Sequence, residues 1–223
     1  MTKRSMLPFA AIAAGAMLIA GGLWVSSAPQ SGMTLAAVAQ EARAVGEAAA
    51  LPDLVMGQQD APVTIIEYAS YTCSHCANFH ETVLAPLKAE YIDTGKVKFI
   101  HREVYFDKFG LWAGMIASCV GPEKYYPVSG MIYDTQADWI GDGKEATISA
   151  NLRKIGLKAG LTGDQVEACL NDMDRAQAMV ASYQQKAGAD GIDATPTLII
   201  NGTKHSNMGY EALKKIIDAE LAK

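Results

Sequence analysis

The chain has 223 residues, which suits one domain with an insertion or two small domains around a sizeable hydrophobic core. Half of its residues are hydrophobic and the formal net charge is −5, an ordinary balance for a globular protein. No basic run is present to favour binding to nucleic acid, so we expect no nucleic-acid partner.

The first 28 residues have the pattern of a targeting segment. Lys3 and Arg4 precede an uncharged apolar run over residues 6–25, which is typical of a secretory signal. We therefore predict export, with residues 1–28 as a signal peptide. The alternative is an anchor in the inner membrane, because residues 6–25 are close to the ~20 residues that span a bilayer. Residues 29–53 follow as an Ala-rich lead segment, either a short helix or a flexible arm.

An apolar, β-rich run over Val63–Ala69 predicts a buried central strand, and Leu54–Met56 predicts a short edge strand before it. Glu67 interrupts the apolar run. Its carboxylate either faces the surface or is a buried acid beneath the site that follows. Buried acids can exchange protons with reacting groups, so the second alternative would give Glu67 a catalytic role.

Two cysteines separated by two residues follow this strand, in the order Cys73-Ser74-His75-Cys76. Apolar positions then recur at spacings of three and four, which predicts a helix with Cys73 at its N-terminus. Unpaired backbone N–H groups there, together with a protonated His75, should lower the pKa of Cys73 and make it the exposed nucleophile. Cys76 lies one turn deeper, placed to attack a mixed disulfide formed at Cys73.

Two other interpretations of the cysteine pair fit less well. A covalent haem site needs histidine directly after the second cysteine, and Ala77 stands there. A zinc site could use Cys73, Cys76 and His80, but the fourth ligand of a closed structural site is missing. We therefore expect neither a metal nor a cofactor.

The next elements complete the first part of an α/β domain, residues 54–106. Pro86 should kink the helix that carries the cysteines, and Gly95 should end it. Val97–His101 predicts the next strand, and residues 102–106 should lead out of the sheet.

Residues 107–189 have a helical pattern throughout, which predicts an all-helical insertion. Gly121-Pro122 should end its first helix, and Tyr125–Trp139 should form an aromatic-rich second helix. Thr162 and Gln165 have the spacing of a capping box. We assign the aromatic and methionine side chains of this region to its core.

The α/β domain resumes over residues 190–223. Thr195-Pro196 precedes a short β-rich run, and Pro is tolerated at a strand start because its missing N–H is not needed there. Asn201-Gly202 between two β runs is a strong signal for a type I′ hairpin. A final amphipathic helix should begin at Gly209-Tyr210.

This order of elements resembles a thioredoxin fold with an inserted all-helical domain, as in DsbA-type thiol:disulfide oxidoreductases. The matching residues are Cys73-Ser74-His75-Cys76, the preceding Glu67, and Thr195-Pro196. The resemblance implies that Pro196 is cis and faces the disulfide, and that the backbone of Thr195 pairs with an extended substrate. It also implies a basic residue beside the buried acid, for which His101 is the nearest counterpart.

The resemblance implies a monomeric enzyme that introduces disulfides into unfolded exported proteins and is reoxidised by a DsbB-type membrane oxidase. A disulfide isomerase or reductase of the same fold would use the same chemistry but would have to be kept reduced. A thioredoxin-like copper-binding protein would instead hold Cu(I) with the thiolates of Cys73 and Cys76.

The two remaining cysteines, Cys119 and Cys169, each lie near the end of a predicted helix. In an oxidising compartment an even number of cysteines favours pairing. Some DsbA-type relatives resemble this chain in carrying a second pair in the inserted domain. We therefore predict a structural disulfide between Cys119 and Cys169, the alternative being two free cysteines packed as small apolar side chains.

Overall fold

The structure is a computed structural model that describes residues 50–223. The predicted signal peptide or anchor, and nearly all of the Ala-rich lead, lie outside the described residues. Within the described part, no helix is both long and apolar enough to cross a membrane.

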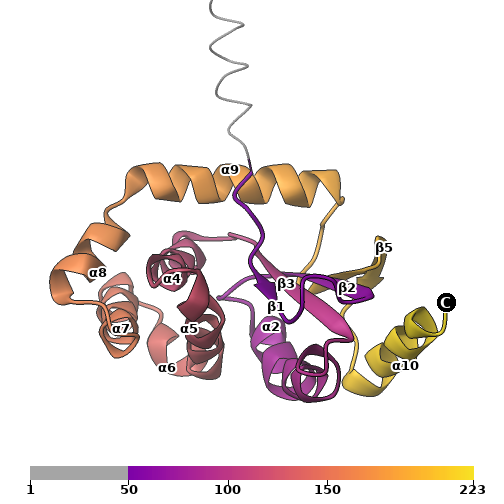
Figure 1. The fold of residues 1–223 in the computed structure, drawn as a ribbon. Coiled ribbons are helices and arrows are strands. Elements are labelled where there is room, and N and C mark those ends of the chain that lie inside the picture. The colour runs from indigo at the N-terminus through magenta and orange to yellow at the C-terminus, as the bar shows by residue number, and fades with distance from the viewer. Residues whose placement is uncertain (1–49) are drawn as a thin grey trace, which may run out of the picture. The chain divides into compact units, whose positions relative to one another are not determined.

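A five-stranded mixed sheet forms the centre of the fold, in the order β1-β3-β2-β4-β5 (Figure 1). The strands are β1 (Val55–Met56), β2 (Val63–Ala69), β3 (Val97–Glu103), β4 (Thr197–Ile200) and β5 (Thr203–Ser206). The neighbours β2 and β3 are parallel, and all other pairs are antiparallel. The register places Glu67 of β2 directly beside His101 of β3.

The strand β3 is longer than the sequence pattern indicated. We expected residues 102–106 to leave the sheet, but Arg102 and Glu103 still pair with Tyr68 and Ala69. The prediction was wrong because the charged residues at the end of the strand interrupt the apolar pattern from which a strand is predicted. Arg102 bonds to carboxylates at the sheet surface, and Glu103 accepts hydrogen bonds from tyrosine hydroxyls.

The helix after the cysteine pair runs without a break from Ser74 to Ile92, alternating α-helical and π-helical turns. Its parts are α2 (Ser74–Phe79), η1 (His80–Leu84), α3 (Ala85–Leu87) and η2 (Lys88–Ile92). Pro86 lies between the two π-helical turns, and both proline and π-helical turns are places where a helix departs from the regular α-helical hydrogen-bond ladder. Gly95 has a φ of 77° and ends the segment, as its predicted role requires.

Six helices form the insertion between β3 and β4. They are α4 (Lys108–Cys119), α5 (Pro122–Asp134), α6 (Gln136–Ile140), α7 (Glu145–Lys158), α8 (Gly163–Leu170) and α9 (Met173–Ala189). The expected single helix Tyr125–Trp139 is instead two, because Thr135 leaves helical geometry with a φ of −110°. The capping box of Thr162 and Gln165 is present at the start of α8. Cys119 and Cys169 form a disulfide, with their Cα atoms 6.2 Å apart.

The sheet is covered on both faces (Figure 1). Apolar side chains of β2, β3 and β4 pack on one face against the helix segment from α2 to η2 and against α10 (Tyr210–Leu221). The end of α9 covers the other face, where Ala187 packs on Tyr68 and Ile199. The core of the insertion reaches Cys76, so the cysteine helix packs on both parts of the fold.

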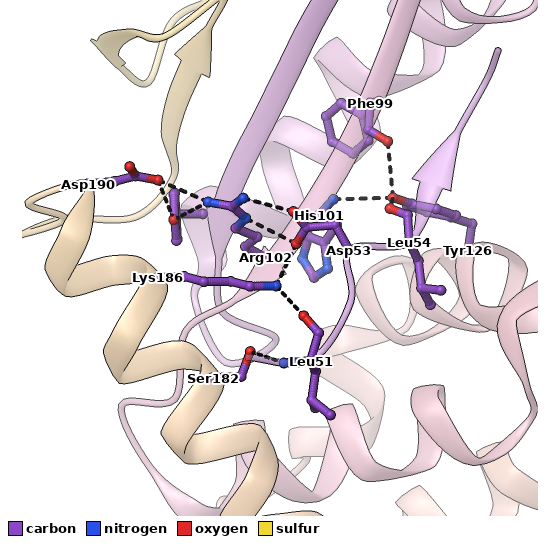
Figure 2. Close-up of polar contacts among 11 residues, drawn as sticks. Leu51, Asp53, Leu54, Phe99, His101, Arg102, Tyr126, Ser182, Lys186 and Asp190 are labelled. Atoms are coloured by element: carbon purple, nitrogen blue, oxygen red, sulfur yellow. Dashed lines mark hydrogen bonds and ion pairs between the residues drawn. The ribbon is translucent and has the colours of Figure 1, made fainter. Parts of the chain in front are cut away.

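Ion pairs and hydrogen bonds connect the segment before β1 to β3 and α9 (Figure 2). Asp53 accepts two hydrogen bonds from Arg102, at 3.1 and 2.8 Å, and one from Lys186 at 2.7 Å. Arg102 also donates to Asp190, which lies at the end of α9. Lys186 and Ser182 bond the backbone of Leu51. These contacts hold β1 in place as the edge strand.

The C-terminal part follows the sequence prediction closely. Asn201 and Gly202 have φ values of 44° and 83°, the positive values that a type I′ turn needs. The final helix begins after Gly209 and buries Leu213 and Ile217 against the sheet.

Candidate active site

The turn between β2 and α2 places Cys73 at the N-terminus of the cysteine helix. Cys73 has extended backbone angles as the N-cap residue, and its N–H donates to the carbonyl of Ser70 at 3.1 Å. Its own carbonyl accepts from the N–H groups of Cys76 and Ala77, both at 3.1 Å. The side chain is half-buried, less open than the exposed nucleophile we expected, whereas Cys76 is buried.

The environment of Cys73 favours its thiolate. A hydrogen bond from the Cys76 thiol is the largest influence, and against the opposing effect of burial it lowers the pKa of Cys73 from 9.0 to about 5. The Thr195 hydroxyl and the backbone N–H groups of Cys76 and His75 act in the same direction. The helix N-terminus therefore lowers the pKa of Cys73, as the sequence predicted, and His75 takes part through its backbone N–H.

The pKa of Cys76 moves in the opposite direction. Its hydrogen bond to Cys73, its burial and the negative charge of Glu67 all raise it above the ordinary value. Reduced protein at neutral pH thus holds a thiolate at Cys73 and a protonated thiol at Cys76.

Thr195 and Pro196 lie beside the nucleophile, although they are far from it in sequence. The peptide bond between them is cis, and the carbonyl oxygen of Thr195 is 3.7 Å from Sγ of Cys73. His75 and Lys204 line a polar pocket together with both residues. The two segments that the sequence marked as catalytic are therefore adjacent.

Glu67 is fully buried, so the alternative of a surface-facing carboxylate is wrong. Its Oε2 is 2.9 Å from Nε2 of His80, which is also buried. Oε1 is buried and has no hydrogen-bond partner among residues 50–223. We expected His101 to be the basic companion of this acid. His101 does lie beside Glu67 in the sheet, but its ring nitrogens bond to other groups, and the hydrogen bond to the acid is made by His80.

Both ring nitrogens of His101 are bonded to tyrosines of α5. Nδ1 is 2.8 Å from the hydroxyl of Tyr125, and Nε2 is 3.0 Å from that of Tyr133. Tyr125 donates its own proton to Glu103, so it accepts the Nδ1 proton of His101. Burial and the nearby His80 lower the pKa of His101 well below its usual value, which keeps the ring neutral.

Glu67, His80 and His101 bring potential metal-ligating atoms within 4.8 Å of one another. A metal would have to displace the tyrosine hydroxyls from His101 and the carboxylate from His80. The hydrogen bonds already in place are a better account of this cluster.

Sequence reasoning missed one residue that holds the nucleophile loop. The side-chain amide of Gln136, at the start of α6, donates to the carbonyls of Tyr71 at 2.7 Å and Cys73 at 3.0 Å. The insertion therefore supports the backbone on both sides of Thr72. A polar residue at a helix start gives no signal that it reaches a loop 63 residues away.

Comparison with known proteins agrees with this geometry. A family model described as thioredoxin matches residues 49–219. The chain belongs to the thioredoxin family. A Bacillus anthracis member named disulfide bond formation protein D is 30% identical over 186 residues, covering 75% of this chain and 78% of that protein. The crystal structure of Wolbachia pipientis alpha-DsbA1 superposes with a TM-score of 0.70 at 29% identity, covering 80% of this chain and 96% of the other.

These similarities confirm the expected resemblance to DsbA-type members of the thioredoxin family, and with it the fold class. A Rickettsia typhi member named as a protein-disulfide oxidoreductase is 28% identical over 170 residues, or 76% of this chain. The chain spans 62% of the length of that rickettsial relative.

Proposed function

We propose that this chain is a periplasmic thiol:disulfide oxidoreductase that introduces disulfides into exported proteins. The opposite pKa shifts of the two active-site thiols carry the proposal. A thiol with a low pKa is a good leaving group, and stabilising the reduced form makes the disulfide a stronger oxidant. The pKa of about 5 at Cys73 is therefore the property expected of a donor of disulfides.

The first step opens the enzyme disulfide. A substrate thiolate attacks Sγ of Cys73, a new sulfur–sulfur bond forms between substrate and enzyme, and the Cys73–Cys76 bond breaks. The electron pair leaves on Sγ of Cys76. Because burial and the charge of Glu67 disfavour a thiolate there, Cys76 takes up a proton.

The second step releases the product. A second substrate thiolate attacks the substrate sulfur of the mixed disulfide, so the substrate gains a disulfide and loses two electrons. Cys73 leaves as the thiolate that its surroundings stabilise. The enzyme ends as a dithiol and must be oxidised again before the next cycle.

The substrate would lie along the pocket beside the cis peptide bond. The carbonyl of Thr195 is close to Cys73, and an extended chain could pair with this backbone as an added strand. Backbone pairing does not depend on side chains, which suits an enzyme that acts on many unfolded substrates.

The N-terminal pattern of Lys3, Arg4 and the apolar run over residues 6–25 supports export, with retention as an inner-membrane anchor as the alternative. We further propose that a DsbB-type membrane oxidase reoxidises the cysteine pair and that the enzyme works as a monomer. Sedimentation of the reduced and oxidised protein tests the last point.

Equilibration of purified protein with glutathione tests the function. We expect a disulfide that reduced glutathione opens readily, and oxidised enzyme that converts a reduced two-cysteine peptide into its disulfide. Cys73→Ser should abolish the conversion. A disulfide that stays closed against millimolar reduced glutathione would contradict an oxidising role. Recovery of scrambled ribonuclease by the reduced form would favour the isomerase alternative, and tight Cu(I) binding at one ion per chain would favour the copper alternative.

A further inference from the structure

The loop that carries the nucleophile is held by the helical insertion. The hydroxyl of Tyr71 donates to Oγ of Ser129 on α5, at 3.0 Å. The hydroxyl of Thr72 donates to Oδ2 of Asp107, the N-cap residue of α4, at 2.8 Å. The side-chain amide of Gln136 on α6 is the third contact. Three helices of the insertion therefore hold the two residues that precede the nucleophile.

Gln136 differs from the other two contacts because it binds the backbone. Its Nε2 donates to the carbonyl oxygen of Tyr71 at 2.7 Å and to that of Cys73 at 3.0 Å. Tyr71 is buried, and its carbonyl has no other hydrogen-bond donor within residues 50–223. Loss of the amide would leave this buried carbonyl unpaired, which is unfavourable.

These bonds fix the backbone on both sides of Cys73. One amide holds the carbonyl that precedes Thr72 and the carbonyl of Cys73 itself. The N–H between these carbonyls donates to the backbone of Ser70 at 3.1 Å. Three successive peptide groups are thereby held, and with them the backbone angles of Thr72 and Cys73. The direction in which Cys73 presents its sulfur depends on those angles.

That direction matters because the thiolate of Cys73 is stabilised by donors at fixed positions. The backbone N–H groups of His75 and Cys76, in the first turn of α2, act on it together with the Cys76 thiol. Hydrogen bonds weaken steeply when donor and acceptor are misaligned. In oxidised protein the Cys73–Cys76 bond holds the same turn covalently, so the amide is needed most in the reduced form.

We propose that Gln136 is a positioning residue that keeps Cys73 aimed at the donors of the first helical turn, so that the insertion sets the reactivity of the nucleophile. Gln136 acts through the backbone of the loop, because its amide bonds two carbonyls. The inference rests on the proposed function, since a stabilised Cys73 thiolate is the leaving group of that reaction.

Gln136→Leu removes the amide without changing the charge. If the donors lose alignment, the thiolate absorbance step of reduced protein should move about 0.5–1 pH unit higher, a fraction of the about one to two units that a whole hydrogen bond to a charged group represents. The equilibrium with glutathione at pH 7 should then favour the reduced form about three- to tenfold less. Gln136→Asn keeps the amide on a shorter side chain, so it should reach one carbonyl and give an intermediate step.

Asn151 on α7 offers a matched control. Its side-chain amide also donates to two backbone carbonyls of the insertion, those of Asp138 at 3.1 Å and Trp139 at 3.4 Å. Both carbonyls are near the end of α6, whereas Gln136 is at its start. Asn151→Leu therefore removes the same kind of bridge away from the cysteine loop. It should lower the stability of both redox forms equally and leave the Cys73 step in place.

The variants leave the titratable groups around Cys73 unchanged. These groups are Cys76, His75 and Glu81 on the cysteine helix, Asp107 and Asp134 on the insertion, and Asp193, Lys204 and His205 in the pocket beside Thr195. Because every substituted side chain is uncharged, a shift of the absorbance step would report the backbone and not a new charge.

The absorbance of the reduced proteins between about pH 3 and pH 8 gives the position of the step. Urea unfolding of the reduced and oxidised proteins at pH 7 gives the stability of each form. Gln136→Leu should lower the stability of the reduced form more than that of the oxidised form. A wild-type step in Gln136→Leu, with an equal loss of stability in both forms as in Asn151→Leu, would overturn the proposal.

If Gln136→Leu does not fold, Gln136→Asn decides, and a wild-type step in that variant would overturn the proposal. A failure of the proposed function has a different signature. The wild-type disulfide would then stay closed against reduced glutathione, while the absorbance steps of wild type, Gln136→Asn and Asn151→Leu would still show whether Gln136 positions Cys73.

Discussion

The thiolate of Cys73 gives the most direct test of the site. Its pKa should be about 5 in the reduced protein, compared with 9.0 for an ordinary cysteine. At pH 7 about 99% of this thiol would then be ionised, against about 1% for the unperturbed group. We expect the thiolate absorbance of reduced protein to rise in a single step centred near pH 5, and Cys73→Ser to lose that step.

The same shift makes the stability of the reduced protein depend on pH. Because the pKa of Cys73 is lower in the folded state, ionisation of Cys73 stabilises the reduced protein. This contribution to the free energy of unfolding is complete above about pH 9 and is lost as the pH falls through about 5. Linkage gives at most about 2.7 kcal/mol at pH 7, and less after solvent screening because Cys73 is partly exposed. Cys76 adds no change between pH 4 and 7, since its raised pKa keeps it protonated throughout.

Urea unfolding of reduced and oxidised protein at pH 4 and pH 7 measures this difference. The reduced form should gain stability relative to the oxidised form as the pH rises, because the disulfide has no thiol to titrate. Cys76→Ala removes the hydrogen bond that lowers the pKa of Cys73 most, so the Cys73 absorbance step should move to higher pH. His75→Ala keeps the backbone N–H and should move the Cys73 step less than Cys76→Ala does. A wild-type step near pH 9, or no shift in Cys76→Ala, would refute the reasoning.

Three further predictions concern the rest of the fold. Replacing Cys119 and Cys169 by Ser should lower the free energy of unfolding by at most about 4 kcal/mol, because the disulfide links two residues that are 50 positions apart in the chain. Alkylation of denatured, non-reduced Cys73→Ala/Cys76→Ala protein checks the bridge itself. Two alkylated cysteines would show that the disulfide is absent. Gly114→Ala places a Cβ against the carboxylate of Glu103 and 3.1 Å from Met179, so the melting temperature should fall by the equivalent of about 1–3 kcal/mol. The cost of Gly114→Ala should be smaller when it is measured in a Glu103→Ala background, which lacks the obstructing carboxylate. An unchanged or higher melting temperature would count against this packing. Burial raises the pKa of Asp53, but hydrogen bonds from Arg102 and Lys186 outweigh burial and lower the pKa overall. Asp53→Asn should therefore be less stable than wild type by about 1–3 kcal/mol at pH 7, and this difference should close only below pH 3.8, where wild-type Asp53 is protonated. A difference in stability that does not depend on pH would mean that the charge of Asp53 is not what holds this segment.

Local features of the chain could be predicted from the sequence because residues close together in the chain determine them. The strand before the cysteines, the helix after them and the type I′ turn at Asn201-Gly202 depend on spacing and on backbone preferences within a few residues. The boundaries of β3 and α5 were misjudged for the opposite reason. Arg102 and Glu103 are stabilised in the strand by partners elsewhere in the fold, which no short window contains.

The sequence by itself determined the reactive pair, because Cys73 and Cys76 are separated by less than one helical turn and the strand before them fixes where the helix begins. Only the tertiary structure decided which groups act on that pair. Thr195 is 122 residues from Cys73, and the choice between His80 and His101 as partner of Glu67 depended on how α5 packs. The tyrosines of α5 occupy both nitrogens of His101, so the carboxylate takes its hydrogen bond from His80. A hydrogen bond requires two groups within about 3 Å, and that distance is set by packing, which the order of residues along the chain does not contain.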